Sequence, residues 1–380
     1  MSQSLPVRPW LAAAVTLVLA ACGGGKQESS GEAAPAAAPE EKVLNVYNWS
    51  DYIAEDTIAN FQTATGIKVN YDVFDNNEVL EAKLLAGSTG YDVVVPSASF
   101  LERQIKAGVF RKLDKSKLPN WQNLDPAVMK VLALHDPGNE HAVPWLWGTT
   151  GIGYNVAKVK AALGEVPVNS WSLIFDPKIA AKLKGCGITL LDAPSEVIDS
   201  VQIYLGLDPN GEKPEDLKAA ADVLMSVRPY VKYLHSSQYI NDLANGEVCV
   251  SLGWSGDVLQ ARDRAVEANK GIEIAYTVPK EGAIMWFDMM AIPADAKHPD
   301  NAHAWINNAM DPKVIAGVSN FVQYANGNAA ALPMVDDAVK NNPGIYPDEA
   351  TKAKLHAHLA ESEAYSREAN RAWTKFRTGK

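Results

Sequence analysis

The sequence predicts an α/β protein with two lobes, each built on an open, mostly parallel sheet flanked by helices. From Val43 onward, short apolar runs alternate with segments of helical periodicity, and a second series of the same kind begins at Leu173. Strands that alternate with helices are typical of a largely parallel sheet with helices on both faces. A chain of 380 residues is also long enough for two domains. We therefore expect a ligand cleft between two lobes.

The first 42 residues are expected to lie outside this fold. Residues 1–21 carry Arg8 followed by an apolar run from Trp10 to Ala20, which is typical of a secretory signal peptide. The run ends in Leu-Ala-Ala-Cys, which resembles a bacterial lipobox, so we expect cleavage there and a lipid on Cys22. A cleaved soluble protein is the alternative. Residues 22–42 are rich in small and polar residues without apolar periodicity, and we expect a flexible tether.

The first lobe is expected to begin with a strand at 43–47. Ile58 and Phe61 then lie at helical spacing, and Gly66 would end that helix before an alternating strand at 67–71. The same pattern continues with a helix around 79–84, a strand at 91–95 and a helix around 101–105.

Residues 119–144 are expected to be irregular, and the apolar run that follows is expected to cross to the second lobe. From there the pattern predicts strands at 187–191, 248–252, 272–276 and 284–292, and helices at 217–224, 239–245, 258–268, 305–310, 314–318 and 348–376. The expected lobe boundaries are 43–147 and 270–323 for lobe I, and 148–269 and 324–380 for lobe II.

Charge and motifs exclude several functions. The formal net charge is −10, which argues against nucleic acid as a partner. Gly253-Trp254-Ser255-Gly256-Asp257 lacks the final glycine of the G-x-S-x-G nucleophile motif. No histidine stands in an HExxH pattern, and no phosphate-binding G-x-x-x-x-G-K-[ST] motif occurs. We therefore expect no catalytic residues, no metal and no cofactor.

The three cysteines are informative because of the expected export. If Cys22 carries a lipid, Cys186 and Cys249 remain as an even pair in an oxidising compartment, and we predict a disulfide between them. Two buried free thiols are the alternative. A metal site is not expected, because no His or Cys at ligand spacing accompanies either residue. The bridge would brace the strand that leads to Gly253.

Several expected strand ends combine an aromatic ring with a carboxylate or hydroxyl group. Each alone is compatible with core packing or a helix cap, and Asp257 at the start of a helix is such a case. Together they predict a cleft with aromatic walls and acidic ends, which suits an elongated organic cation. These strand ends are Trp49-Ser50-Asp51-Tyr52, Ser97 to Phe100, Asp192 to Glu196, Trp254 to Asp257, Trp286-Phe287-Asp288, and Tyr324 with Asn326.

An exported enzyme is the alternative that these residues leave open. Aromatic platforms and paired carboxylates also suit sugars, as in glycoside hydrolases. A sensor that uses the same fold for signalling is a further alternative.

From Val43 to its end, the chain resembles the polyamine-binding proteins of bacterial ATP-driven importers. The resemblance implies a type II periplasmic-binding-protein fold that closes by a hinge, a membrane permease as partner and a disulfide matching Cys186 and Cys249. We accordingly expect a periplasmic, lipid-anchored monomer that binds spermidine or putrescine. The motifs that carry the resemblance are Tyr47 to Tyr52, Val95 to Phe100, Gly253 to Asp257, Trp286 to Asp288 and Tyr324 to Asn328.

The resemblance also implies a role for each site residue. Trp286 stands where putrescine receptors of this group usually have Phe, and the larger ring favours spermidine. The implied roles are stacking on the ligand chain for Trp49, Trp254 and Trp286, wall contacts for Tyr52 and Tyr324, one ammonium end for Asp257 and Asp288, and the other end for Ser50, Ser97, Glu196 and Asp51.

Overall fold

The computed structural model describes residues 40–165 and 167–380. Within it, Glu40–Lys380 form one compact unit. The expected signal peptide, Cys22 and most of the expected tether lie outside the described residues. Among the helices of the described part, none is long and apolar enough to cross a membrane.

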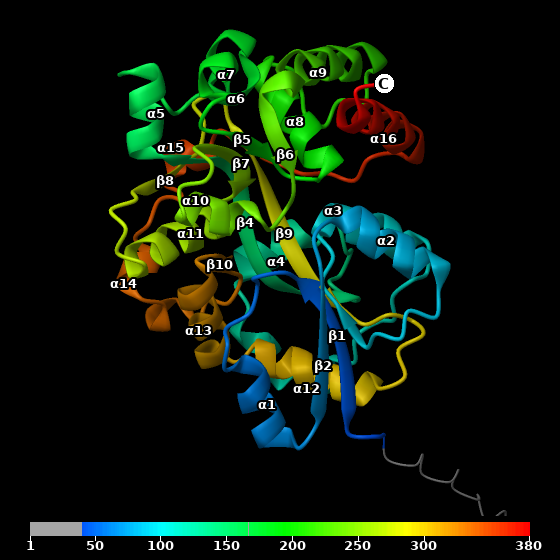
Figure 1. Ribbon diagram of the computed structural model, residues 1–380. Helices are drawn as coiled ribbons and strands as arrows, with labels where there is room; N and C mark the ends of the chain where they lie inside the picture. Colours follow the sequence, from blue (N-terminus) through cyan, green and yellow to red (C-terminus); the bar gives the residue numbers. More distant parts are fainter. Residues whose placement is uncertain (1–39, 166) are drawn as a thin grey trace, which may run out of the picture. The chain divides into compact units, whose positions relative to one another are not determined.

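The described residues form one continuous mixed sheet (Figure 1). Its main path runs in the order β2-β1-β3-β9-β4-β7-β5-β6, while β8 and β10 pair with β4 and β11 pairs with β9. The strands are β1 Val43–Trp49, β2 Lys68–Phe74, β3 Val93–Val94, β4 Ala142–Asn155, β5 Ile188–Leu190, β6 Val231–Leu234, β7 Val250–Trp254, β8 Ile274–Thr277, β9 Ala283–Ala291, β10 Ala325–Asn326 and β11 Leu355–Ala357.

Pairing is parallel in the outer parts of the sheet and antiparallel at its centre. β1 is parallel to β2 and β3, and β5 is parallel to β6 and β7. The 14-residue strand β4 runs antiparallel to β9 and β7. Because the chain leaves along β4 and returns along β9, the central strands must run in opposite directions. The α/β class is confirmed, and β4 with β9 joins the two parallel parts.

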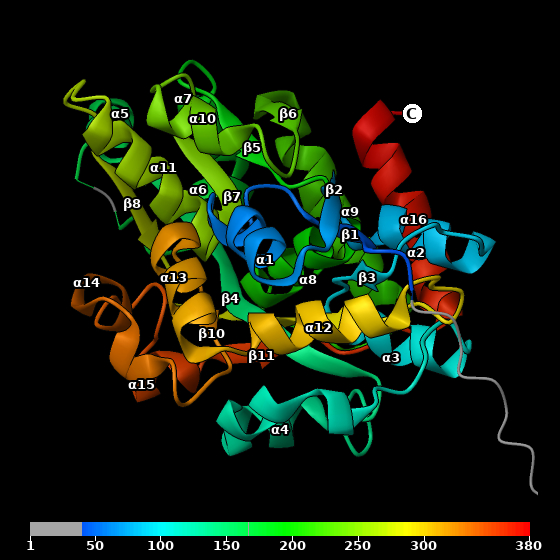
Figure 2. The same cartoon turned by 90° about the horizontal axis from the view of Figure 1, so that it is seen from below.

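Helices cover both parts of the sheet. Figure 1 shows α1, α2, α3 and α12 around β1 to β3, and α5 to α9 around β5 to β7. Both views place α16 beside α8 and α9 (Figure 2). The helices are α1 Thr57–Thr65, α2 Asn77–Ala86, α3 Ala98–Lys106, α4 Pro126–Leu132, α5 Val156–Leu163, α6 Ser172–Phe175, α7 Pro177–Leu183, α8 Pro194–Tyr204, α9 Pro214–Val227, α10 Tyr239–Ala244, α11 Ser255–Glu267, α12 Pro299–Ala309, α13 Pro312–Val322, α14 Asp337–Lys340, α15 Glu349–Lys352 and α16 Glu363–Thr378, with 3-10 turns at Lys115–Lys117, Pro119–Asn123, Arg228–Tyr230 and Leu332–Met334.

Two expected segments differ from the structure. Residues 119–144 are not irregular throughout, because Asp125 caps α4 by accepting a hydrogen bond from the backbone N–H of Ala127, and Pro126 occupies the first helical position. The segment 348–376 is not one helix. It contains β11, which pairs with β9 at Leu355 and Ala283. Sheet pairing therefore overrides the helical pattern in the middle of that segment.

The predicted disulfide between Cys186 and Cys249 is confirmed, with a Cα–Cα distance of 5.4 Å. Cys249 directly precedes β7 and Cys186 lies two residues before β5, and these strands pair with each other, since Ile188 of β5 is opposite Val250 of β7. The bridge therefore fixes the start of β7, the strand that ends at Trp254.

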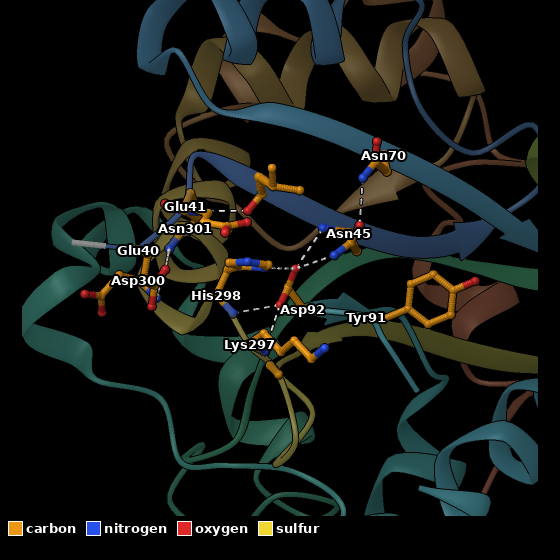
Figure 3. A network of polar contacts seen from close by, with 12 residues as sticks. Glu40, Glu41, Asn45, Asn70, Tyr91, Asp92, Lys297, His298, Asp300 and Asn301 are labelled. Atoms are coloured by element: carbon orange, nitrogen blue, oxygen red, sulfur yellow. Dashed lines mark hydrogen bonds and ion pairs between the residues drawn. The ribbon is translucent and has the colours of Figure 1, made fainter. Parts of the chain in front are cut away.

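A polar network fixes the first described residues to α12 (Figure 3). The Glu40 carboxylate accepts hydrogen bonds from the backbone N–H groups of Asp300, at 2.9 Å, and Asn301, at 3.1 Å. The nearby Asp92 accepts from the backbone N–H of His298 at 2.9 Å. A carboxylate at a helix N-terminus is stabilised by the free N–H groups there. These contacts tie the segment before β1 to the N-terminus of α12.

Candidate functional site

Ten of the eleven expected ligand residues line one cavity with an empty volume of about 300 Å³. They come from the end of β1, the start of α3, the first turn of α8, the β7–α11 junction, β9 and the residue before β10. Ends of parallel strands are the usual place for ligand sites in open α/β sheets. The lining residues are Trp49, Ser50, Tyr52, Ser97, Glu196, Trp254, Asp257, Trp286, Asp288 and Tyr324.

Five aromatic side chains, here called the aromatic box, form the apolar walls of the cavity. The Trp254 ring centroid lies 5.4 Å from that of Trp49 and 6.4 Å from that of Trp286, and both pairs meet edge to face. Tyr324 lies 5.5 Å from Trp286 and 5.1 Å from Tyr52. All five rings are buried. Edge-to-face packing fixes each ring against its neighbours.

Asp257 is held by two tyrosine hydroxyl groups. Tyr324 donates to Oδ1 at 2.7 Å, and Tyr239 donates to Oδ2 at 2.9 Å. Neither carboxylate oxygen accepts from a described backbone N–H group, so the alternative role as a helix cap is not supported. Burial raises the pKa of Asp257 to about 7, and the two tyrosine hydrogen bonds act in the opposite direction.

Two glycines make room for these tyrosines. A Cβ on Gly253 would lie 2.6 Å from the Tyr239 ring, and a Cβ on Gly256 would lie 2.4 Å from the Tyr324 ring. Neither glycine has a positive φ. Their role is therefore close approach to an aromatic ring, and not a tight turn. α11 accordingly begins at Ser255, earlier than the pattern indicated.

Asp288 is the second buried aspartate of the cavity. It accepts a hydrogen bond from Ser97 Oγ at 2.6 Å, and the buried Tyr52 hydroxyl lies near it without a well-formed hydrogen bond. Burial raises the pKa of Asp288 to about 7, while the Ser97 hydrogen bond lowers it. Ser97 and Asp288 thus face the same part of the cavity, although the resemblance assigned them to opposite ends of the ligand.

Glu196 is the third buried carboxyl group of the cavity. Its Oε2 accepts from Trp254 Nε1 at 2.8 Å and from Thr150 Oγ1 at 2.6 Å. Thr150 Oγ1 in turn accepts from Trp286 Nε1 at 3.1 Å. Burial raises the pKa of Glu196, and the two direct hydrogen bonds oppose this effect.

Thr150 and Tyr239 are the site residues that sequence reasoning missed. Thr150 lies in β4 within an apolar, glycine-containing run, and Tyr239 begins a short helix. Both are fully buried and contact carboxylates rather than the cavity surface. The one available signal was Gly253, whose missing side chain indicates a close neighbour.

Asp51 does not line the cavity. Its Oδ1 accepts from Arg264 Nη2 at 2.8 Å, and its Oδ2 accepts from Ser237 Oγ at 3.0 Å. The backbone at Asp51 is left-handed, with φ 54°, and Gln260 Nε2 donates to its carbonyl oxygen at 3.3 Å. The protein itself therefore satisfies this carboxylate, which links the end of β1 to α10 and α11.

The three cavity carboxylates have no direct ion-pair partner in the described part of the chain, although His358 and Arg264 act electrostatically on Glu196 and Asp257 from a greater distance. Among the described residues, none of Glu196, Asp257 and Asp288 forms an ion pair. Taking a carboxylate out of water without a counter-ion is costly, and a bound cation would supply the missing charge. The described residues contain no group of three or more side chains placed to hold a metal ion. The cavity thus combines aromatic walls with three buried acids.

The fold and this cavity define a solute receptor of the periplasmic-binding-protein class. The chain belongs to the family described as bacterial extracellular solute-binding protein, whose model matches residues 56–347. It has the two-lobed fold of that class and is a binding protein, not an enzyme.

Relatives and a solved structure agree with this assignment. The chain is 57% identical over 345 residues to a putrescine-binding periplasmic protein of Escherichia coli, covering 90% of this chain and 93% of the relative. It is 34% identical over 317 residues to a spermidine/putrescine-binding periplasmic protein of the same organism, covering 83% and 86%. A spermidine/putrescine substrate-binding protein from Streptococcus pneumoniae has a similar structure, with a TM-score of 0.70 at 27% identity, covering 89% and 99%.

Proposed function

We propose that the protein captures a polyamine, putrescine or spermidine, in the periplasm and delivers it to an ATP-driven membrane importer. The observation that carries this proposal is a set of three buried carboxyl groups, none of them in an ion pair with a described residue, beside an aromatic box. The relatives at 57% and 55% identity are named as putrescine-binding periplasmic proteins, which supports the ligand class and the compartment. The relatives named above are binding proteins and give no support to the alternative of an exported hydrolase.

The aromatic and the acidic residues of the cavity make different contacts with the ligand. The tryptophan and tyrosine rings cover the methylene groups of the ligand and attract its ammonium groups. The carboxylates accept charge-assisted hydrogen bonds from the ammonium groups. Rings alone would not suffice, because removing each ammonium group from water costs several kcal/mol.

The preference between putrescine and spermidine depends on the cavity wall that Trp286 forms. Trp286 gives the box a larger ring than Phe would, which supports spermidine, whereas the relatives of higher identity are named for putrescine. We propose that the site accepts both and that the ring at position 286 sets their ratio. Competition between the two ligands in the wild type and in Trp286→Phe measures this ratio.

We further propose the lobe assignment and the anchor. Lobe I comprises 43–147 and 270–323, lobe II comprises 148–269 and 324–380, and closure occurs around β4 and β9. A lipid on Cys22 holds this monomeric receptor at the membrane, and mass spectrometry of the exported protein tests that modification.

Titration calorimetry and uptake measurements test the function. We expect putrescine and spermidine to bind with 1:1 stoichiometry and neutral sugars not to bind. Cells that lack the gene should take up less labelled polyamine. Absence of polyamine binding would contradict the receptor, whereas binding with unchanged uptake would indicate the sensor alternative.

A further inference from the structure

We propose that Thr150 is a positioning residue for ligand binding, because its hydroxyl group couples the Trp286 indole to the Glu196 carboxyl group. This inference rests on the proposed polyamine function and adds to it a residue that does not line the cavity. Through this coupling, the ring at position 286 acts on the ligand through a carboxylate as well as by direct contact.

Thr150 occupies a central place in the sheet. It lies in β4 opposite Trp254 of β7 on one side and Ile284 of β9 on the other. Its side chain has no solvent exposure. The backbone on both sides is therefore fixed by strand pairing, and the hydroxyl group has a defined position beneath the cavity.

The direction of the hydrogen bonds follows from the chemistry of the groups. The indole N–H of Trp286 can only donate, so Thr150 Oγ1 accepts from it at 3.1 Å. The single hydroxyl proton of Thr150 is then directed to Glu196 Oε2 at 2.6 Å. A phenylalanine at position 286 could not donate to Thr150, so the direction of the two hydrogen bonds, from Trp286 to Thr150 and from Thr150 to Glu196, depends on the indole N–H.

The same oxygen of Glu196 receives a second donor. Trp254 Nε1 donates to Oε2 at 2.8 Å, while Oε1 accepts no hydrogen bond from the described residues. Both protein donors thus converge on one oxygen, and Oε1 remains for the ligand. Removing the Thr150 hydroxyl group would allow the Glu196 carboxyl group to rotate and would remove a donor that favours its ionised form.

Calorimetric titration of putrescine into full-length variants tests this role. We expect Thr150→Val to weaken binding at least about tenfold at pH 7, and Thr150→Ser, which keeps the hydroxyl group, to stay within about threefold of the wild type. Thr189→Val is the matched control, since Thr189 is equally buried in β5 but donates its hydroxyl group to Ser251 Oγ and not to a cavity carboxylate.

A double-mutant cycle with Glu196→Gln separates positioning from general structural damage. If Thr150 acts through Glu196, Thr150→Val should cost less than about threefold in the Glu196→Gln background. The loss in Trp286→Phe should become smaller in the same background, because only its direct contact with the ligand remains, and this tests the coupling even if Thr150→Val fails to fold. An undiminished loss in that background, or equal losses in Thr150→Val and Thr150→Ser, would overturn the proposal. Failure of the wild type to bind putrescine or spermidine would instead refute the proposed function.

Discussion

Replacing Asp257 by Asn should change ligand binding and protein stability in opposite directions. The side chain is 4% exposed and has no ion-pair partner among the described residues. The substitution keeps the shape of the group and the acceptor for Tyr324, but it removes the negative charge. The ligand loses a charged hydrogen-bond partner, whereas the unliganded protein no longer has to bury that charge.

The two magnitudes follow from the environment of Asp257. A hydrogen bond to a charged group contributes about 1.5–3 kcal/mol, which corresponds to a loss of affinity of about 10-fold to 150-fold. The rise in the Asp257 pKa from 3.8 to about 7 corresponds to roughly 4 kcal/mol of lost stability when the group is fully ionised. Because the folded state holds the proton more tightly, this loss develops as the pH rises from about 4 to about 7.

Calorimetry with a polyamine and thermal unfolding without ligand measure the two effects. At pH 8 we expect Asp257→Asn to melt at a higher temperature than the wild type, and the difference should shrink towards pH 4, where both side chains are neutral. Polyamine affinity at pH 8 should fall more than tenfold. Unchanged affinity would remove Asp257 from the site. A lower melting temperature at pH 8 would refute the reasoning about its buried charge.

Three further predictions concern protons, closure and the disulfide. Burial raises the pKa of Asp257 and Asp288 to about 7, so polyamine binding should release protons at pH 6 and almost none above pH 8.5. Calorimetry in buffers of different ionisation enthalpy measures this release, and a release that did not depend on pH would contradict the prediction. Asp51→Asn should speed ligand dissociation about fivefold, because it weakens a partly exposed ion pair between Asp51, which follows β1, and Arg264 of α11. Stopped-flow fluorescence measures the rate, and an unchanged rate would count against a role of this ion pair in holding the ligand. Replacing both Cys186 and Cys249 by Ala should lower the free energy of unfolding by about 4 kcal/mol, since the bridge closes a loop with a sequence separation of 63. Denaturant titrations measure this change, and a loss below about 1 kcal/mol would be inconsistent with the entropic explanation.

The sequence was a good guide to the order of strands and helices and a poorer guide to their pairing. Apolar periodicity located β1, α1 and β7 because those segments bury one face against a common core. It could not reveal that β4 runs antiparallel to both neighbours, since strand direction depends on where the chain crosses. β11 was missed for a related reason: its pairing partner is far away in the chain.

The lining of the cavity was also predictable, whereas its supporting contacts were not. Rings and acids at strand ends have a distinct composition, so Trp254 and Asp257 could be recognised. Thr150 and Tyr239 contribute one hydroxyl group each from buried positions, and nothing in their local sequence distinguishes them from ordinary core residues. Asp51 is the opposite case: its place in the motif from Trp49 to Tyr52 suggested a ligand contact, but its carboxylate forms an ion pair with Arg264.

The stretch from Gly253 to Asp257 has a consequence for redesigning the receptor. The orientation of Asp257 depends on two tyrosines that can approach only because Gly253 and Gly256 lack side chains. A mutant library limited to residues that line the cavity can remove the Asp257 carboxylate, but it leaves Gly253, Gly256 and Tyr239 unchanged and so cannot freely change the direction of that carboxylate. Libraries that also vary the two glycines together with Tyr239 could move the fixed charge, and so reach ligands of different length.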